Sequence, residues 1–292
     1  MSISKRHHFI PKYYLNNFTN EDNTFYIFDK KNPKKILRRS PKQVCFEDHR
    51  NSMFGKSNIP HPYLEEKVYG FFDNKHAQVF NELCNNKVDL EYWSIDRVHV
   101  LEYLIPFMYW RNPKNDQEFD NIINSMKSLH ELDLTISNGN SGDEIDDLEF
   151  HKEILNTPDF RKAARINYGI KTFRHNVKKH KELEWRVYDY QGFGGFVTSD
   201  FPLLFKNKIL EIADLRGDVI LPVSPYRSFM RIDENKENNF PTPAIQNFSQ
   251  IHYADRFVIS HNKEYLELLV SEYNRISSSG EIDDLLKKLW VF

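Results

Sequence analysis

The spacing of hydrophobic residues changes several times along the chain, and each change predicts a different kind of element. Residues 24–30 (TFYIFDK) and 34–40 (KKILRRS) have the short apolar pattern of strands, and Asn32-Pro33 between them is a turn signal. From residue 62 the period becomes helical. The pattern predicts an amphipathic helix over residues 62–84, with Leu64, Val68, Phe72, Val79 and Leu83 on its apolar face.

The middle of the chain continues as helices. Residues 97–111 are apolar enough for a buried helix, which Pro106 should kink and Asn112-Pro113 should end. Residues 116–136 and 149–181 also have a helical pattern, with the glycine-containing acidic loop NGNSGDEIDD between them. These segments together predict a helical layer.

After residue 183 the pattern returns to strands. The predicted strands are residues 184–190, 194–200, 218–224, 227–233 and 255–261, and a helix capped by Asn262 covers residues 262–276. This order predicts an α+β fold in which N-terminal and C-terminal strands form a mixed or antiparallel sheet on a central helical layer. We expect a single domain, residues 1–292, with parts at 1–57 (N-terminal strands and loop), 58–182 (helical layer), 183–262 (C-terminal sheet) and 263–292 (terminal helix).

Composition narrows the class of protein. The chain has 292 residues, and its 23 Phe, 15 Tyr and 4 Trp supply a large apolar area for one core. A net charge of −2 does not suggest a protein coated in nucleic acid, although residues 30–42 (KKNPKKILRRSPK) are dense in lysine and arginine. Cys45 and Cys84 lack a disulfide or zinc spacing, and no secretion signal or membrane span is recognised. We therefore expect a cytoplasmic protein with no membrane partner.

The candidate chemistry is scattered, because no phosphate loop, zinc spacing or nucleophile elbow is present. His7 and His8 face opposite sides of an extended segment, so one of them could face a site as base or ligand while the other packs. Glu65 and Asp73 are eight residues apart on nearly the same helix face. Arg111 closes an apolar helix and could fork onto a carboxylate or a phosphate.

A second group of candidates lies at the ends of the later strands. Ser199-Asp200 precede Phe201-Pro202, which requires a defined turn, and Asp and Ser are favoured there simply as turn formers. The segment LPVSPYR is a companion loop that offers Ser224 and Arg227. Strand ends also carry active groups in α+β proteins, so both interpretations stay open.

The order of these motifs resembles a known family. HHFIPKYYLNNF, SPKQVCFED, LEEKVYGFFDNKHAQVF, RNP, GFVTSDFPLLF and LPVSP follow one another as in the prokaryotic family catalogued as domain of unknown function 4238, from His7 to about Ser260. The chain departs from the family pattern in having Asn112 for Thr, Val223 for Leu and Asp73 for Glu. The resemblance implies a shared α+β fold and groups the polar residues His7, His8, Glu65, Asp73, Arg111, Ser199 and Asp200 in one pocket.

The first hypothesis is a phosphodiester hydrolase, an RNA or DNA nuclease that serves as a toxin or phage-defence effector. A histidine would act as base or ligand, and Asp200 with Glu65 or Asp73 would orient it or hold a cation, with Mg²⁺ and Mn²⁺ as candidates. Arg111 would neutralise the phosphate. The expected catalytic residues are His7, His8, Glu65, Asp73, Arg111 and Asp200, and the expected substrate contacts are Lys12, Arg38, Arg39, Ser199 and Arg227.

The alternative hypotheses need no nuclease. The same polar set could be a structural network in a non-catalytic sensor or binding module, since fully satisfied buried networks specify a fold. An enzyme acting on a small nucleotide is a third possibility. Nucleic acid and a partner protein of a defence or toxin system are the expected partners.

Overall fold

The computed structural model describes residues 5–56, 58–85, 95–177, 183–209, 212–213, 215, 217–233 and 240–290. Its strands are β1 (Arg6–His8), β2 (Phe25–Asp29), β3 (Leu37–Arg39), β4 (Phe46–Asp48), β5 (Leu183–Asp189), β6 (Thr198–Ser199), β7 (Leu204–Phe205), β8 (Lys208–Ile209), β9 (Ile212–Ala213), β10 (Val219–Ser224), β11 (Arg227–Asp233) and β12 (Phe257–Ser260). Its helices are α1 (Lys12–Asn16), α2 (Gly70–Asn85), α3 (Ile95–Arg111), α4 (Asp116–Ser125), α5 (Leu148–Leu155), α6 (Pro158–Val177), α7 (Pro243–Tyr253), α8 (Lys263–Ser279) and α9 (Ile282–Lys287). The fold is α+β, as the sequence predicts.

The strands form antiparallel sheets that join the two ends of the chain. One four-stranded sheet has the order β5-β11-β10-β7, and the other has the order β3-β2-β12-β6. In the second sheet the N-terminal strand β2 pairs with the late strand β12, where Ile27 lies opposite Ile259. β12 also pairs with β6, so Val258 lies opposite Ser199. N-terminal and C-terminal strands therefore share one sheet, as predicted.

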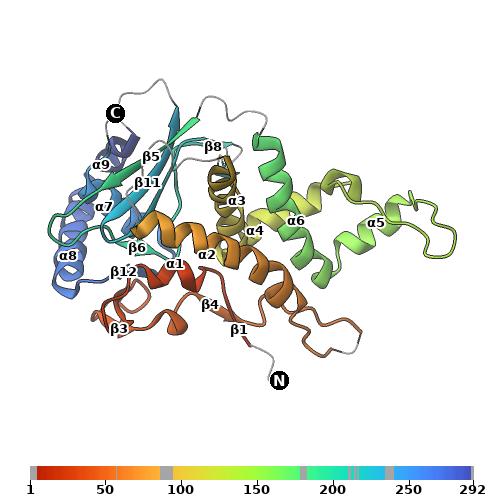
Figure 1. Cartoon of the computed structure of the whole chain (residues 1–292), viewed down its shortest axis with the longest axis horizontal. Helices are drawn as coiled ribbons and strands as arrows, with labels where there is room; N and C mark the ends of the chain where they lie inside the picture. The colour runs from red at the N-terminus through yellow and green to blue at the C-terminus, as the bar shows by residue number, and fades with distance from the viewer. Residues whose placement is uncertain are drawn as a thin grey trace.

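Helices cover the sheets on two sides. Figure 1 shows α7, α8 and α9 gathered at one side of the strands, with α2, α3 and α6 on the other and α5 at the far end. The largest buried apolar cluster draws on the whole length of the chain, from Ile10 through Met108 to Ile259. Tyr14 of α1 contacts both four-stranded sheets. Its hydroxyl lies 2.6 Å from Thr198 Oγ1 of β6 and donates to the Pro222 carbonyl of β10 at 2.6 Å.

Two long predicted helices are each divided. The helix expected at 116–136 ends at Ser125, and a 3₁₀ turn follows at Leu129–Leu132 behind a capping box formed by Ser128 and Glu131. The helix expected at 149–181 is split between α5 and α6, because Pro158 starts a new helix at a position that proline favours. Local caps and proline therefore override a continuous hydrophobic period.

The strand expected at 194–200 is reduced to Thr198–Ser199. Gly194 and Gly195 have φ values of +78° and +63°, which end an extended strand. A Cβ on Gly194 would overlap the ring of Tyr265, and one on Gly195 would overlap the carbonyl oxygen of Pro225. The two glycines therefore let this loop pass close to its neighbours.

Helix α3 ends at Arg111, immediately before Asn112-Pro113, as predicted. Pro106 lies inside the helix, and the kink expected there stays a prediction. Asn112 then caps the following turn by accepting from Lys114 N. Within the described ranges, the helices are too short or too polar to cross a bilayer.

Candidate functional site

A π-helical segment at Leu64–Tyr69 leads into α2 and aligns two carboxylates. The N–H of Gly70 donates to the carbonyl of Glu65, five residues earlier, which widens the turn. In a regular α-helix, at about 100° per residue, Glu65 and Asp73 would point roughly 80° apart. The wider turn reduces this offset, so both carboxylates reach the same arginine. π-Helical turns are frequent at functional sites.

That arginine is Arg111, the last residue of α3, which is 3% exposed. Its Nη1 donates to both carboxylate oxygens of Asp73, at 2.9 and 3.0 Å, and its Nη2 lies 3.4 Å from Glu65 Oε1. The guanidinium sits 4.4 Å from the centre of the Tyr69 ring. Burial disfavours its charge, but Asp73 and Glu65 outweigh that cost and raise the pKa of Arg111.

Asn51 connects this ion pair to His7. Its backbone N–H donates to His7 Nδ1 at 3.0 Å, and its side-chain amide donates to Glu65 Oε2 at 2.7 Å. Since Nδ1 of His7 accepts a hydrogen bond, the ring proton of the neutral imidazole is on Nε2. His7 is fully buried. The first histidine therefore belongs to a buried hydrogen-bonded network with Glu65, Asp73 and Arg111.

His8 has a different environment. Its Nε2 lies 3.1 Å from the Pro41 carbonyl, which only accepts, so Nε2 carries the proton and Nδ1 keeps a lone pair. Burial and the charge of Lys12, with smaller effects of Arg111 and Arg6, lower the pKa of His8 to about 4. His8 is therefore neutral at pH 7, and the charges of Lys12, Arg111 and Arg6 act on it.

Ser199 and Asp200 hold the late turn in place. The Asp200 carboxylate accepts from the backbone N–H groups of Asp255, Arg256 and Phe257, at 3.0, 2.8 and 3.0 Å. Ser199 is fully buried and donates to Gln250 Oε1 at 2.7 Å. Burial raises the pKa of Asp200 to about 6, although the three backbone bonds act in the opposite direction.

The histidines and the Asp200 carboxylate have different hydrogen-bond partners, and their meeting in one cavity stays a prediction. The Asp200 carboxylate is bonded to these backbone amides, whereas His8 is bonded to Pro41 and His7 to Asn51. The turn at Asp200 is linked to the end of α3, because the side-chain amide of Asn112, next to Arg111, donates to the Asp200 carbonyl at 2.5 Å. Asp200 therefore stabilises the turn next to Arg111, and its catalytic role stays a prediction.

The predicted substrate contacts are dispersed. Lys12 is an exposed residue at the start of α1, beside His8. Arg38 forms an ion pair with Asp22, and Arg39 donates to the Arg38 carbonyl at 2.8 Å. Arg227 binds Asp189 at 2.5 Å. Of this set, Lys12 is the cation whose charge acts on His8.

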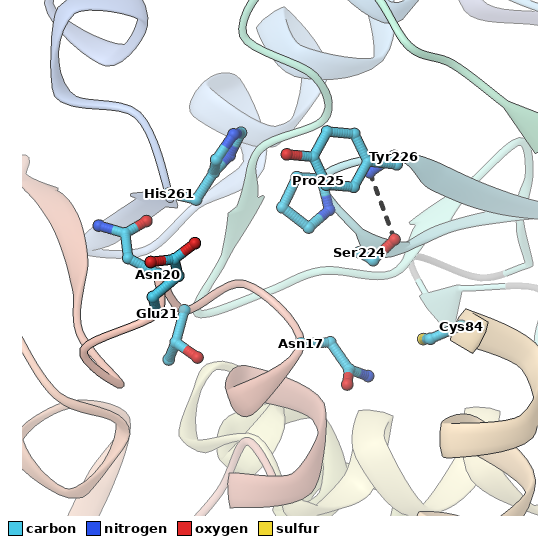
Figure 2. Close-up of a pocket in the computed structure, with 9 residues that line it drawn as sticks. Asn17, Asn20, Glu21, Cys84, Ser224, Pro225, Tyr226 and His261 are labelled. Carbon is cyan, nitrogen blue, oxygen red and sulfur yellow. Dashed lines mark hydrogen bonds between the residues drawn. The ribbon is translucent and has the colours of Figure 1, made fainter.

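A cavity of about 450 Å³ opens beyond the other end of α2. Figure 2 shows Ser224 at the end of β10 and Pro225 and Tyr226 in the turn after it, with His261, Glu21 and Cys84 around the same space. Burial raises the pKa of Cys84 to about 12, so this thiol is not a ready nucleophile. The described lining residues include a carboxylate and no lysine or arginine, so the cavity does not suit a phosphate.

No sequence pattern points to Asn51, Arg50, Pro41 or Tyr13 as part of the site. Arg50 donates from Nε to the Arg111 carbonyl at 2.9 Å and forms an ion pair with Asp116 at 2.6 Å. The hydroxyl of Tyr13 is buried without a hydrogen-bond partner. Asn51 and Pro41 act partly through backbone atoms, which leave no signal in the residue types. The segment DHRNS, which contains Arg50 and Asn51, is polar, and polarity was the only signal in it.

The comparisons with known proteins decide the family. A family model described as protein of unknown function (DUF4238) matches residues 6–264. The chain belongs to this family. The DUF4238 match includes both histidines, the carboxylates of the π-helical turn and α2, Arg111 and the turn at Asp200. No curated protein and no solved structure matches the chain.

Proposed function

We propose that this DUF4238 chain hydrolyses phosphodiester bonds in RNA or DNA, with His8 as the general base. One observation carries the proposal: a neutral imidazole with a lone pair on Nδ1 lies in the field of Lys12, Arg111 and Arg6. Positive charge around a neutral base favours an anionic substrate, and phosphate is the anion that lysine and arginine commonly bind.

In this mechanism Nδ1 of His8 takes a proton from the attacking water. The water oxygen bonds to phosphorus, the bond from phosphorus to the leaving oxygen breaks, and the leaving oxygen takes a proton from solvent. Lys12, which is exposed, contacts the phosphate and stabilises the added charge. A bound phosphate also offsets the cations, so it raises the pKa of His8 and makes the imidazole a stronger base.

The buried ion pair then has a positioning role. Arg111 already bonds to Asp73 and Glu65, so it acts on His8 through its charge rather than as a direct phosphate ligand. The network through Asn51 holds Glu65 and His7 in place. The expected cation bound by Asp200 with Glu65 or Asp73 has less support, because these carboxylates have other partners.

The test is cleavage of labelled single-stranded and double-stranded RNA and DNA by the purified full chain, with Mg²⁺, with Mn²⁺ and with EDTA. His8→Gln and Lys12→Met should each reduce the rate at least tenfold, whereas Lys34→Met, which removes the same charge from an exposed position, should retain it. If none of these substrates is cleaved, or if His8→Gln is fully active, the proposal is wrong. A toxin or phage-defence role further requires that expression of the wild type, but not of His8→Gln, slows growth.

A binding module is the second candidate, and the bonds that already link Arg111 to Asp73 and Glu65 favour it. Such a module would bind anionic ligands around Lys12 without turnover. Fluorescence anisotropy with the same oligonucleotides separates the two candidates. Salt-sensitive binding that Lys12→Met weakens, without any cleavage, would support the module over the hydrolase.

A further inference from the structure

A second group of potential ligands lies near α5, far along the molecule from β1 and α1 (Figure 1). One ligand atom from each of His130, Asp146 and His151 lies within 4.8 Å of the other two. The two imidazole rings are 5.4 Å apart and nearly perpendicular. His130 Nε2 is 3.5 Å from Asp146 Oδ1. The cluster uses residues from two helical turns and the acidic loop between them.

His151 provides the most specific indication of a ligand. The residue is fully buried, and its Nε2 lies 2.8 Å from the carbonyl oxygen of Ile145. Because a carbonyl can only accept, the ring proton is on Nε2 and Nδ1 has an open lone pair. Nδ1 is itself buried and has no hydrogen-bond partner. A histidine with one N–H on a backbone carbonyl and the other nitrogen free is oriented as metal-binding histidines are.

The ring of His130 has a comparable arrangement. Its Nε2 faces Asp146, while Nδ1 lies 3.6 Å from Glu144 Oε1. A carboxylate beside the far nitrogen fixes the ring and increases the basicity of the near one. Glu144 can therefore support His130 as a ligand without binding the metal itself.

The backbone between these residues forms a compact turn that places Asp146. Ile145 N donates to the Ile136 carbonyl at 2.8 Å, and Asn138 N donates to the Asp143 carbonyl at 2.8 Å. Asp147 then starts α5 by accepting from Glu149 N and Phe150 N. The turn and the helix cap together fix where the chain passes between His130 and His151.

We propose that His130, Asp146 and His151 bind one divalent transition-metal ion of the zinc class. Two imidazole nitrogens and one carboxylate favour Zn²⁺ over Mg²⁺, which prefers oxygen ligands and keeps its waters. Zinc–ligand bonds of about 2.0–2.2 Å place tetrahedral ligand atoms roughly 3.3–3.6 Å apart. The separation of His130 Nε2 and Asp146 Oδ1 fits this value, and water completes the coordination.

The ion would connect the turn at Leu129–Leu132, the acidic loop and α5. Binding closes the chain between His130 and His151, so the metal stabilises this part of the molecule. The site is independent of His8, and its loss leaves the proposed hydrolase reaction intact.

The experiment titrates ZnCl₂, and separately MgCl₂, into the full chain after treatment with a chelator, using calorimetry. The wild type should bind one Zn²⁺ per chain and no Mg²⁺ at this site. Asp146→Asn and His130→Gln should each weaken Zn²⁺ binding at least tenfold, in the range of about 10–100-fold known for perturbed metal sites. Asp143→Asn removes the same charge from the same exposed loop and should bind as the wild type does.

Thermal unfolding supplies a second measurement. Zn²⁺ should raise the melting temperature of the wild type and of Asp143→Asn, and should leave that of Asp146→Asn unchanged. Zinc affinity that is equal in all the variants, or an absence of zinc binding to the wild type, would overturn the proposal.

Discussion

Arg111, at the end of α3, donates through Nη1 to both carboxylate oxygens of Asp73 in α2, at 2.9 and 3.0 Å. The guanidinium is almost completely buried, and the Asp73 side chain is 30% exposed. The pair therefore joins two helices at the edge of the core, and solvent reaches it from the carboxylate side.

Replacing Arg111 should be strongly destabilising. Arg111→Met leaves the carboxylates of Asp73 and Glu65 without their main partner, and breaking a buried ion pair costs about 3–5 kcal/mol. Urea unfolding measures this change. Arg275→Met removes an arginine that is paired with Glu272 on the surface and should not alter the midpoint. An Arg111→Met midpoint close to that of the wild type would show that the pair contributes little.

Two adjacent tyrosines should respond differently to loss of the hydroxyl. Tyr14→Phe removes the group that contacts Thr198 and Pro222, and leaving buried partners unsatisfied costs about 1–3 kcal/mol. Tyr13→Phe removes a buried hydroxyl that has no partner, so its stability should be unchanged or higher. Both rings pack against Phe80, which makes the two variants a matched pair in thermal denaturation. An equal fall in melting temperature for the two variants would contradict the hydrogen bonds assigned to Tyr14.

Asp200→Asn should destabilise the protein and change its response to pH. The variant replaces one accepting carboxylate oxygen with an NH₂ group, so at least one of the buried N–H groups of Asp255, Arg256 and Phe257 loses its acceptor, which costs about 1–3 kcal/mol. Because the pKa of Asp200 is raised to about 6 from 3.8, the folded wild type holds a proton that the unfolded chain releases between these values. The wild type should therefore gain stability relative to the variant as the pH falls from 6 to 4.

The pH response is checked by urea unfolding of the wild type and of Asp200→Asn at pH 4, 5, 6 and 7. The difference between their free energies of unfolding should be largest at pH 4. Asp284→Asn, a change at an exposed surface pair, should show the wild-type response. A difference that grows as the pH rises would mean that Asp200 has a lowered pKa.

Periodicity and turn chemistry predicted much of the fold. Asn262 marks the start of α8 through its side chain, and Asn112-Pro113 marks the end of α3, because both act locally. The π-helical turn before α2 was not predictable, since it depends on one extra residue per turn and not on residue type. The divided helices follow from Pro158 and the capping box at Ser128, which a search for continuous periods ignores.

The candidate site was predicted only in part. Arg111, Glu65 and Asp73 lie together as the family resemblance implied, and carboxylates beside an apolar face need such a partner. The bonds of His7 and His8 involve Asn51 N and Pro41 O, and such backbone partners depend on the fold rather than on side-chain type. Asp200 follows its turn-forming tendency through backbone bonds to a distant segment, which no local pattern identifies.

The lowered pKa of His8 predicts that the stability of the protein falls in acid. The pKa of His8 in the free protein is lowered to about 4 from 6.5, so folding leaves it neutral where the unfolded chain is protonated. Stability that depends on neutral His8 is present above pH 6.5 and declines as the pH falls towards 4. His8→Gln removes this titrating group. The free energy of unfolding of the variant should therefore change less than that of the wild type between pH 6.5 and 4.

The pH dependence of phosphodiester cleavage by the purified chain tests the central claim most directly. For the wild type, kcat/KM should fall only near pH 4, where free His8 becomes protonated, and kcat should fall at a higher pH because bound phosphate raises the pKa. His8→Gln should lose at least tenfold in rate at every pH while remaining folded. An acid limit of kcat/KM near pH 6.5, or a profile that His8→Gln leaves unchanged, would contradict His8 as the general base.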